Sequence, residues 1–497
     1  MPARMTLQEL IGGIPGGRVA PPGGADAATV ARVVHRADDA GPGDVFCAVP
    51  GLRADGHDFA PQAVARGAVA VIAERPLPGI GVPVALVPDA RLALALAAAA
   101  LAGRPSEHLD VVGVTGTNGK TTSAFLLRSV LEAAGRPCGL IGTVEARVGG
   151  EAVPVRHTTP DPVELQGLLA RMRAAGDRAC AMEVSSHALD QRRAAGVRFA
   201  AALFTNLTRD HLDYHPDVES YYRSKRALFL RPPGEGDDPP AASNLDDPHG
   251  RRLAAEAGAL GYAVDDPGAV VRPLEAEGLA TGIRARMATP RGPLEVRSRL
   301  RGRFNLANIA GVVAVGELLE LPHEAVAAGI AALPGVPGRF EPVEAGQPFA
   351  VIVDYAHTPD SLENVLRAGR ELVPGGRRLI VVFGCGGDRD RGKRPQMGAA
   401  ARALADIAVV TSDNPRSEDP EAIIADILAG AGEGPAELVV EPDRRAAIAR
   451  AVEMAAPGDV VLVAGKGHEQ GQERDGVVTP FDDREVARSV LTGAAAA

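Results

Sequence analysis

The chain has 497 residues, more than one ordinary hydrophobic core can organise, so two to four domains are expected. Its 46% hydrophobic and 23% charged residues are typical of a soluble globular protein and exclude an intrinsically disordered one. The formal net charge of −10 argues against nonspecific nucleic-acid binding, but it leaves room for a local pocket that takes a small anionic substrate.

The N-terminal part of the chain contains no segment that predicts export or membrane insertion. Residues 1–13 lack the long apolar core of a signal peptide. The longest apolar run, residues 92–102, is too short to span a bilayer, and its flanks, Pro88-Asp89 and Gly103, predict a buried helix. The four cysteines show no paired spacing, so we expect reduced thiols without disulfides or zinc. We therefore expect a cytoplasmic protein that is not inserted in a membrane.

Short runs of Val, Ile, Leu and Ala alternate with longer helical patterns along most of the chain. This alternation predicts βαβ units and mainly parallel sheets. Residues 103–108 and the Pro/Gly-dense residues 334–339 have the composition of domain joints. They divide the chain into an N-terminal domain at 1–107, a middle domain at 108–338 and a C-terminal domain at 339–497. The expected fold class is α/β with three domains.

A glycine-rich loop at residues 116–122 stands between a strand pattern and a helical pattern in the middle domain. Its glycines let successive N–H groups point at phosphate oxygens, and the following helix adds the positive end of its dipole. Lys120 can neutralise the β- and γ-phosphates, and the Thr121 hydroxyl can bind Mg²⁺. The loop is a variant, because the pattern GxxxxGK[ST] requires glycine where Val114 stands. The residues expected to bind ATP here are Gly116, Thr117, Asn118, Gly119, Lys120, Thr121 and Thr122.

Two segments bearing carboxylates and histidines follow further strand patterns of the middle domain. Glu183 comes at the end of an apolar run, where a carboxylate suits Mg²⁺ shared with phosphate oxygens. Asp210 and His211 lie in a dense polar segment after the next run, which favours a functional site over a surface cluster. Lys225 lies in a helical pattern at 219–229 and, taken alone, is typical of a solvated helix lysine.

Four apolar runs of the C-terminal domain each lead directly into a polar or glycine-rich segment. The runs are residues 350–353, 379–383, 407–410 and 460–464, and the segments after them begin DYAH, GCGGDRDRGKR, TSDNPR and GKGHE. Ligands of open α/β sheets bind at the carboxyl ends of the strands, where loops converge. These four loops therefore predict a single site.

Several of these segments resemble the Mur ligase family, which shares its nucleotide loop with folylpolyglutamate synthetases. The resemblance rests on TGTNGKTT at the phosphate loop, HTTP at 157–160, EVSSH at 183–187, GRFNLAN at 302–308 and DYAHTP at 354–359, and it extends over essentially the whole chain. It implies an N-terminal α/β uridine-nucleotide domain, a central P-loop parallel-sheet ATPase domain and a C-terminal Rossmann-like α/β domain. It also implies an ATP-dependent ligase that converts a carboxylate into an acyl phosphate and joins it to an amine.

The resemblance further implies roles for individual residues. Asn305 and Asp354 would hold the adenosine of ATP. Catalysis would involve Lys120, Glu183, His211 and Lys225. Magnesium would be bound by Thr121, Glu183, His211 and by Lys225 carrying a carbon dioxide-derived carbamate (N6-carboxylysine). A UDP-muramoyl-dipeptide would contact His35, Leu52, Arg53, Ala54, Thr158, Thr159, Ser185, Gln191 and Arg193. For His35 an ordinary strand-end residue is an equal alternative, because this chain reads Val-His-Arg where the family commonly has Asp-Ser-Arg.

The incoming amine is inferred from the loop Asp-Asn-Pro-Arg at 413–416, a form seen in diaminopimelate-adding members of the family. Arg416 offers a planar fork that would repel the ammonium of a lysine side chain and attract the distal carboxylate of meso-diaminopimelate. Gly465 and Glu469 supply an acceptor and an anion for the distal ammonium, and Arg389 is placed for another carboxylate. The residues expected to bind diaminopimelate are Arg389, Asp413, Asn414, Pro415, Arg416, Gly465 and Glu469.

Three alternatives to this hypothesis remain open at the level of sequence. A lysine-adding member of the same family is disfavoured by Arg416 together with Glu469. A folylpolyglutamate synthetase should lack both the uridine-type domain and the loop at 413–416. A nucleotide-gated binding protein that has lost turnover should lack one of the catalytic residues, yet all are present. The expected partners are small molecules (ATP, UDP-muramoyl-dipeptide and meso-diaminopimelate), with no nucleic acid, and a monomer is expected.

Overall fold

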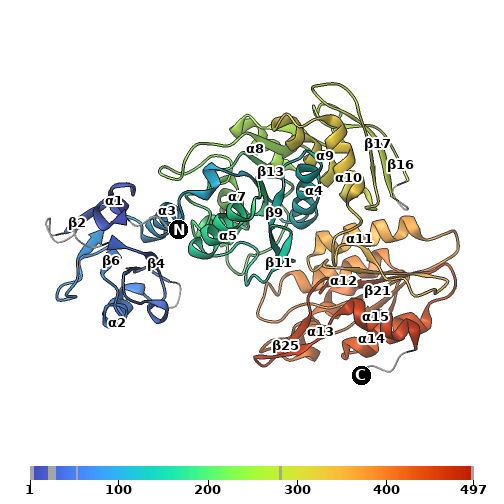
Figure 1. Cartoon of the computed structure of the whole chain (residues 1–497). Coiled ribbons are helices and arrows are strands. Elements are labelled where there is room, and N and C mark those ends of the chain that lie inside the picture. Colours follow the sequence, from blue (N-terminus) through green and yellow to red (C-terminus); the bar gives the residue numbers. More distant parts are fainter. Residues whose placement is uncertain (1–4, 21–28, 52–53, 279–281, 494–497) are drawn as a thin grey trace.

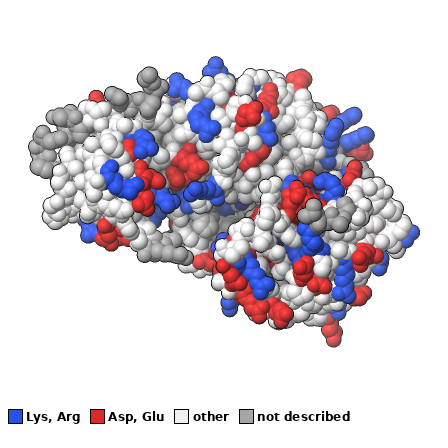
Figure 2. All heavy atoms as spheres, turned by 60° about the horizontal axis from the view of Figure 1, so that its bottom comes forward, with Lys and Arg blue, Asp and Glu red and all other residues white. Residues whose placement is uncertain are grey.

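The computed structural model describes residues 5–20, 29–51, 54–278 and 282–493. In this part of the chain three α/β units follow one another in space as they do in sequence, with the N-terminal unit at one end and the C-terminal unit at the other (Figure 1). Acidic and basic side chains are interspersed over the face drawn in Figure 2. Within the described ranges, no helix combines the length and the apolar character needed to cross a membrane.

The N-terminal unit is a small sheet with strand order β2-β7-β6-β5-β4, parallel except for β2. The helix predicted at 92–102 is confirmed as α3, which starts earlier because Asp89 accepts a hydrogen bond from the backbone N–H of Leu92 and so caps the first turn. The elements are β1 (Met5–Thr6), α1 (Leu7–Gly12), β2 (Arg18–Ala20), β3 (Thr29–Val30), β4 (Arg32–Val34), β5 (Asp44–Cys47), α2 (Ala60–Ala65), β6 (Ala70–Ala73), β7 (Val84–Leu86) and α3 (Ala90–Leu101).

The central unit is built on a sheet of order β11-β10-β9-β12-β8-β13-β14-β15, parallel from β9 to β15. Helices α4, α9 and α10 pack on one face, and α5, α7 and α8 on the other, because their apolar side chains belong to separate cores. The strands are β8 (Asp110–Thr115), β9 (Cys138–Ile141), β10 (Ala146–Val148), β11 (Glu151–Val153), β12 (Ala179–Glu183), β13 (Ala201–Phe204), β14 (Ala241–Asn244) and β15 (Leu260–Tyr262). The helices are α4 (Lys120–Ala133), α5 (Pro162–Ala175), α6 (Ser186–Asp190), α7 (Val218–Arg226), α8 (Pro248–Ala257), α9 (Arg303–Leu318) and α10 (His323–Ala332).

A small antiparallel sheet projects from the central unit at the upper right of Figure 1. Its strands are β16 (Arg272–Glu277), β17 (Ile283–Ala288) and β18 (Leu294–Ser298). One face packs on the core shared by α4 and α9, because Ile283, Ala285 and Met287 are buried while the residues between them are exposed. The alternation leaves the opposite face of this sheet polar.

The C-terminal unit confirms the prediction that four apolar runs form neighbouring parallel strands. Its sheet order is β19-β20-β24-β21-β22-β23, so β20, β24, β21 and β22 lie side by side and all end at one edge. The strands are β19 (Glu341–Pro342), β20 (Ala350–Asp354), β21 (Leu379–Phe383), β22 (Ile407–Val410), β23 (Glu437–Val440), β24 (Val460–Ala464), β25 (Gly471–Arg474) and β26 (Val477–Pro480). The helices are α11 (Pro359–Leu372), α12 (Lys393–Leu404), α13 (Pro420–Ala431), α14 (Arg444–Met454) and α15 (Asp483–Thr492).

A buried ion pair supports the loops at this edge. Arg444 and Asp483 are fully buried and joined by two hydrogen bonds of 2.8 and 2.7 Å, and Arg444 also donates to the carbonyls of Ser412 and Ala464. We expect Arg444→Met to lower the free energy of unfolding by about 3–5 kcal/mol, because it leaves a buried carboxylate without a partner. Denaturant unfolding followed by circular dichroism measures the loss. The double variant Arg444→Met/Asp483→Leu should recover most of it, and an equal loss in both variants would contradict this explanation.

Candidate functional site

A cavity of about 680 Å³ lies where the strand ends of the central sheet face those of the C-terminal sheet. From the central unit it is lined by the loop after β8 and by the ends of β12 and β13, and from the C-terminal unit by the loops after β20, β21, β22 and β24. The predicted residues that line it are Thr117, Asn118, Gly119, Lys120, Thr121, Thr122, Thr158, Thr159, Glu183, Ser185, Arg193, His211, Lys225, Asp354, Arg389, Asp413, Asn414, Arg416, Gly465 and Glu469. The structure therefore brings most of the predicted site into one space.

The glycine-rich loop connects β8 to α4, as predicted from the sequence. Gly119 has φ +84°, a left-handed conformation that lets α4 begin at Lys120 rather than at the predicted residue 123. A β-carbon at Gly116 would overlap the hydroxyl oxygen of Thr205. Both glycines are thus required by the local geometry. The loop and the start of α4 present backbone N–H groups to the cavity, which suits a phosphate chain.

Two lysines converge on the carbonyl of Gly116. Nζ of Lys120 lies 3.0 Å and Nζ of Lys225 lies 2.6 Å from this oxygen. Burial lowers the pKa of Lys120, and burial together with the positive charge of Lys120 lowers the pKa of Lys225 well below its usual value. The solvated environment that is typical of a helix lysine is therefore wrong for Lys225, which is 1% exposed.

Glu183 ends β12 beside Val114 of β8, in the position predicted from its apolar run. It is buried, and its carboxylate accepts hydrogen bonds from the Thr121 hydroxyl at 3.1 Å and from the backbone N–H and hydroxyl of Thr143 at 2.8 and 3.0 Å. The carboxylate thus lies against the first turn of α4, next to the hydroxyl proposed to bind metal. This donor arrangement suits a hard cation at the end of the phosphate chain.

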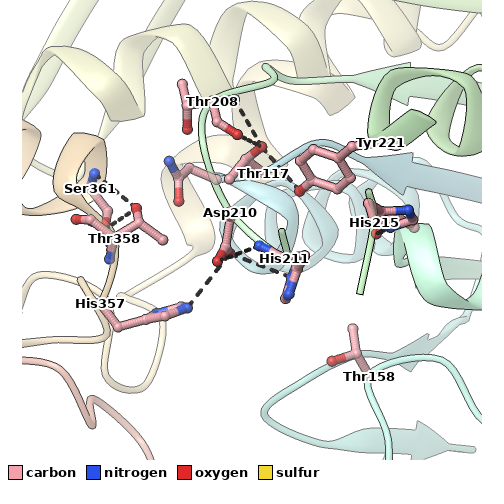
Figure 3. Close-up of polar contacts among 12 residues, drawn as sticks. Thr117, Thr158, Thr208, Asp210, His211, His215, Tyr221, His357, Thr358 and Ser361 are labelled. Carbon is pink, nitrogen blue, oxygen red and sulfur yellow. Dashed lines mark hydrogen bonds and ion pairs between the residues drawn. The ribbon is translucent and has the colours of Figure 1, made fainter. Parts of the chain in front are cut away.

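Asp210 lies between two histidines from different units (Figure 3). Its carboxylate is 3.4 Å from Nε2 of His211 and 3.9 Å from Nε2 of His357, and the backbone N–H of His211 donates to it at 2.9 Å. Burial opposes ionisation of Asp210, but the charge of Lys393 and the hydrogen bond from the backbone N–H of His211 favour the carboxylate, and its pKa is lowered. Burial lowers the pKa of His211 to about 3, so this imidazole is neutral at pH 7 and able to bind a metal ion. His211 also has φ +55°, a strained backbone typical of functional sites.

The loop at 413–416 is held against the hairpin β25–β26. The backbone N–H of Arg416 donates to the carbonyl of Glu473, and its guanidinium lies 3.3 Å from the Glu473 carboxylate and donates to the carbonyl of Gly387 at 2.7 Å. Arg416 has φ +52° and remains 22% exposed at the cavity. Its planar group is therefore positioned before any ligand arrives, by contacts on both sides of the loop.

Glu469, the anion predicted to bind the distal ammonium, is already paired with two side chains of the protein. The fully buried Lys466 lies 3.1 Å from its carboxylate and 2.9 Å from the side-chain oxygen of Asn414, whose amide nitrogen donates to the same carboxylate at 2.9 Å. Lys466 offsets part of the negative charge of Glu469 and fixes the orientation of Asn414. Lys466 makes no hydrogen bond to Asp413. The carboxylate of Asp413 lies next to Gly465 and adds a second acidic group beside Glu469 in the lining of the cavity.

Contacts between the central and C-terminal units close the cavity on two sides. Arg339, at the predicted joint, donates to the Thr121 hydroxyl at 3.1 Å and stacks 4.4 Å from the Tyr355 ring. The side-chain amide of Asn118 donates to the carboxylate of Asp360 at 2.8 Å. These contacts from the C-terminal unit reach the phosphate loop and the first turn of α4 directly.

Some predicted residues lie outside this cavity. His35 directly follows β4 and Ala54 lies in the loop after β5, both in the N-terminal unit, while Leu52 and Arg53 fall outside the described residues. Gln191 does not line the cavity, but its side-chain oxygen accepts hydrogen bonds from Arg193, which does. Three further predicted residues do not line this cavity. The carbonyl of Gly116 accepts hydrogen bonds from the two lysines, and Pro415 lies within the loop 413–416. Asn305 lines a neighbouring cavity.

Sequence reasoning missed several residues that the structure places at the site. Asn308 and Arg339 line the cavity and could have been predicted from the sequence. Asn308 belongs to the GRFNLAN run, and Arg339 is the last residue of the Pro/Gly-dense joint. Thr143, which holds Glu183, stands in no motif, whereas Lys393, which is buried beside His357, belongs to the segment GCGGDRDRGKR and was not predicted individually. Their roles depend on contacts between segments that are distant in sequence.

The donor set fits Mg²⁺ better than a transition metal. Among the described residues, no three His, Cys, Asp or Glu side chains group as a metal cage. Mg²⁺ does not need one, because it takes one or two carboxylates and completes its coordination with substrate phosphates and water. Glu183, His211 and Lys225 all line the cavity beside the phosphate loop and could serve in this way.

Comparison with known proteins adds independent findings. Models of the Mur ligase family match along the chain: its catalytic domain at residues 30–104, its middle domain at 114–316 and its glutamate ligase domain at 338–467. A protein of Gloeobacter violaceus named UDP-N-acetylmuramoyl-L-alanyl-D-glutamate--2,6-diaminopimelate ligase is 49% identical over 91% of both chains. A protein of the same name from Geobacillus thermodenitrificans is 44% identical over 98% of this chain and 99% of its own.

Solved structures are similar to most or nearly all of this chain. One of a UDP-N-acetylmuramoyl-L-alanyl-D-glutamate--2,6-diaminopimelate ligase matches with a TM-score of 0.69 and 32% identity, covering 99% of each chain. A Mycobacterium tuberculosis folylpolyglutamate synthase complexed with ADP and AMPPCP matches with a TM-score of 0.64 and 20% identity over 80% of this chain and 95% of its own, a likeness of fold.

Proposed function

The chain belongs to the Mur ligase family, and we propose that it joins meso-2,6-diaminopimelate to the D-glutamate of UDP-N-acetylmuramoyl-L-alanyl-D-glutamate, consuming ATP. The observation that carries the proposal is the shared cavity. Lys120 and Lys225 of the central unit line the same space as Arg416 and Glu469 of the C-terminal unit. A nucleotide on one side can therefore activate a carboxylate that an amine reaches from the other.

The chemistry requires activation, because a carboxylate is a poor electrophile at neutral pH. A carboxylate oxygen of the D-glutamate attacks the γ-phosphorus, forming an acyl phosphate as ADP leaves. The amine nitrogen then attacks the acyl carbon, and phosphate leaves with the electrons of the C–O bond while the nitrogen loses a proton. The protein contributes alignment of the reacting groups and stabilisation of negative charge by Lys120.

The metal and the modified lysine are parts of the proposal. Mg²⁺ held by Thr121, Glu183, His211 and the carbamate of Lys225 would neutralise charge on the transferred phosphate. The lowered pKa of Lys225 supports the carbamate, because the unprotonated amine forms it. The carbamate would also place an anion beside the ammonium of Lys120, an attractive contact that a second ammonium at this position would not allow.

Each of the three units would bind a different substrate or part of a substrate. We assign residues 1–107 to the uridine end of the substrate, 108–338 to ATP and 339–497 to the amino acid. Each sheet is contained in one of these ranges, which supports the division. His35, Leu52, Arg53 and Ala54 would hold the uridine end, and Thr158, Thr159, Ser185, Gln191 and Arg193 the muramoyl-dipeptide. Asn305 and Asp354 would hold the adenosine. We place the enzyme in the cytoplasm, acting on small molecules alone as a monomer.

The amine assay tests the proposed function. With ATP, Mg²⁺ and the UDP-muramoyl-dipeptide, we expect phosphate release that depends on meso-diaminopimelate, because its distal carboxylate can pair with Arg416. L-lysine, which lacks this carboxylate, should turn over about 100-fold less efficiently in kcat/KM. Comparable turnover with L-lysine would assign the protein to the lysine-adding branch. Glutamylation of a folate would assign it to another family.

The pH dependence of ATP binding tests the role of Asp354. Burial raises the pKa of this carboxyl to about 6, so it is ionised at pH 7.5 and mostly protonated at pH 5. The protonated group cannot accept hydrogen bonds from a ribose as an anion does, so the KM for ATP should rise about tenfold between these pH values. Steady-state kinetics of Asp354→Asn supply the comparison. The ratio of variant to wild-type KM should fall toward one at pH 5, and a ratio independent of pH would argue against this role.

A further inference from the structure

Lys393 lines the ligase cavity, but the proposed function gives it no role. It is the first residue of α12 and follows the loop 384–392, which leaves the carboxyl end of β21. Only 6% of Lys393 is exposed. A positive charge is thus enclosed in the wall of the cavity, on the side of the C-terminal unit.

The ammonium of Lys393 has no partner among the residues that the structure describes. Its side chain forms neither a hydrogen bond nor an ion pair there, whereas Lys120 and Lys225 both donate to the carbonyl of Gly116. An enclosed charge without a partner is unfavourable. An anion that enters the cavity would therefore be stabilised by Lys393.

The start of α12 favours an anion at the same place. Gly392 caps this helix without a side-chain hydrogen bond, so no side chain satisfies the first N–H groups of α12. These groups and the positive end of the helix dipole attract negative charge. The enclosed ammonium and the helix start together provide one position for an anion.

The loop before α12 lies against the segment that supports the phosphate loop. Asp390 of this loop pairs with Arg209 of the central unit at 3.2 Å. The segment that contains Arg209 reaches the phosphate loop through Asn206, whose side-chain oxygen accepts a hydrogen bond from the backbone N–H of Asn118 at 2.9 Å. The start of α12 is therefore on the side of the C-terminal unit that meets the phosphate loop.

The charge of Lys393 acts close to the proposed metal position. Burial and, after it, the charge of Lys393 lower the pKa of His357, whose Nε2 lies 3.9 Å from the carboxylate of Asp210 (Figure 3). Asp210 directly precedes His211, a proposed metal ligand. In the described part of the chain no ion pair joins Lys393 to Asp210, so the ammonium remains able to bind a ligand.

The anion that fits this position is the transferred phosphate. In the proposed function the two carboxylates of diaminopimelate are already matched by the guanidiniums of Arg389 and Arg416. The γ-phosphate has several charged oxygens, and Lys120 would bind those on the side of the central unit. We propose that Lys393 is a further catalytic residue, whose ammonium binds the γ-phosphate of ATP from the side of the C-terminal unit. This inference rests on the proposed function.

The ammonium acts in both chemical steps. When the carboxylate oxygen bonds to the γ-phosphorus and the bond from phosphorus to the ADP oxygen breaks, Lys393 stabilises the negative charge on the transferred phosphoryl oxygens. When the amine then displaces phosphate, the electrons of the C–O bond pass to this phosphate. Lys393 stabilises the charge that the phosphate gains.

Nucleotide binding to the full chain separates a contact with the γ-phosphate from a contact elsewhere. AMPPCP and ADP are titrated calorimetrically, with Mg²⁺ present, into the wild type and into Lys393→Met. We expect the variant to bind AMPPCP about 10–100-fold more weakly, because a charge-assisted contact is lost, and to bind ADP within about twofold of the wild type. Equal weakening of both nucleotides, or unchanged binding of AMPPCP, would overturn the proposal.

Exchange of labelled ADP into ATP tests the first chemical step without the amine. It requires only that the acyl phosphate forms from ATP and UDP-muramoyl-dipeptide and then reverts. Lys393→Met should slow this exchange by about 10²–10³-fold, while the KM for meso-diaminopimelate stays within about twofold. Unchanged exchange with a raised KM for diaminopimelate would assign the ammonium to a carboxylate of the amino acid and overturn the proposal.

The matched control is Arg391→Met, which removes a positive charge from the same loop. The side chain of Arg391 is 70% exposed, pairs with Glu418 at 2.7 Å and does not line the cavity. We expect wild-type binding and exchange, and losses equal to those of Lys393→Met would contradict the proposal. A wild type without amine-dependent phosphate release would overturn the proposed function and this inference together. A normally active wild type with an unaltered Lys393→Met protein would reject only the role of Lys393.

Discussion

Replacing Lys120 with methionine should lower kcat for the ligation by about 10²–10³-fold, the loss typical of removing one group that stabilises charge in a transition state. Methionine keeps most of the side-chain volume and removes the ammonium. Burial already lowers the pKa of Lys120, which means that its charge costs stability in the folded protein. The melting temperature should therefore stay constant or rise, and lost activity cannot then be attributed to unfolding.

A second measurement on the same variant separates the proposed role from simple damage. The charge of Lys120 helps to lower the pKa of Lys225, so its removal should raise that pKa. The activity of the wild type and of Lys120→Met is measured with and without bicarbonate over a range of pH. The pH at which bicarbonate begins to stimulate activity should be higher in the variant. Full ligase activity in Lys120→Met would refute the assignment of the loop. As a control, Arg128→Ala, also on α4 but outside the cavity, should keep normal turnover.

Replacing Arg416 with alanine should raise the KM for meso-diaminopimelate by about 10–100-fold, because one charge-assisted bidentate contact is lost. We expect kcat to change little, since Arg416 would bind the far end of the amino acid and not the reacting nitrogen. The KM for ATP should stay constant. Initial rates at saturating ATP and UDP-muramoyl-dipeptide measure all three values.

The control for this variant is Arg474→Ala. Arg474 lies on the neighbouring strand β25, where its side chain is 68% exposed and does not line the cavity. We expect its kinetics to match those of the wild type. If Arg416→Ala lowered kcat and left the KM for diaminopimelate unchanged, Arg416 would act through the loop geometry rather than through a carboxylate. Its φ of +52° makes Arg416→Gly the useful third variant, since glycine adopts this backbone without strain.

The four buried strands of the C-terminal unit and the convergence of the loops after them were predictable because both follow from local patterns. An apolar run followed by polar residues specifies where a buried strand ends, and parallel neighbours end at the same edge. For this reason Asp354, Asp413 and Gly465 were expected together and are found together. The boundaries of α4 and α7 were less accurate, because Gly119 starts one helix early and the other ends at Arg226.

The sequence alone determined that a phosphate loop is present and that polar loops meet at the ends of parallel strands, since glycine spacing and hydrophobic runs are local properties. Only the tertiary structure decided the environment of Lys225. The helical pattern around this residue predicts a solvated side chain, but burial beside Lys120 lowers its pKa and makes it a weak base. The same holds for Lys466, whose ammonium reduces the charge of Glu469, and for Arg339, which reaches Thr121 across the joint. Burial and charge pairing depend on residues hundreds of positions apart, so no local pattern in the chain carries them.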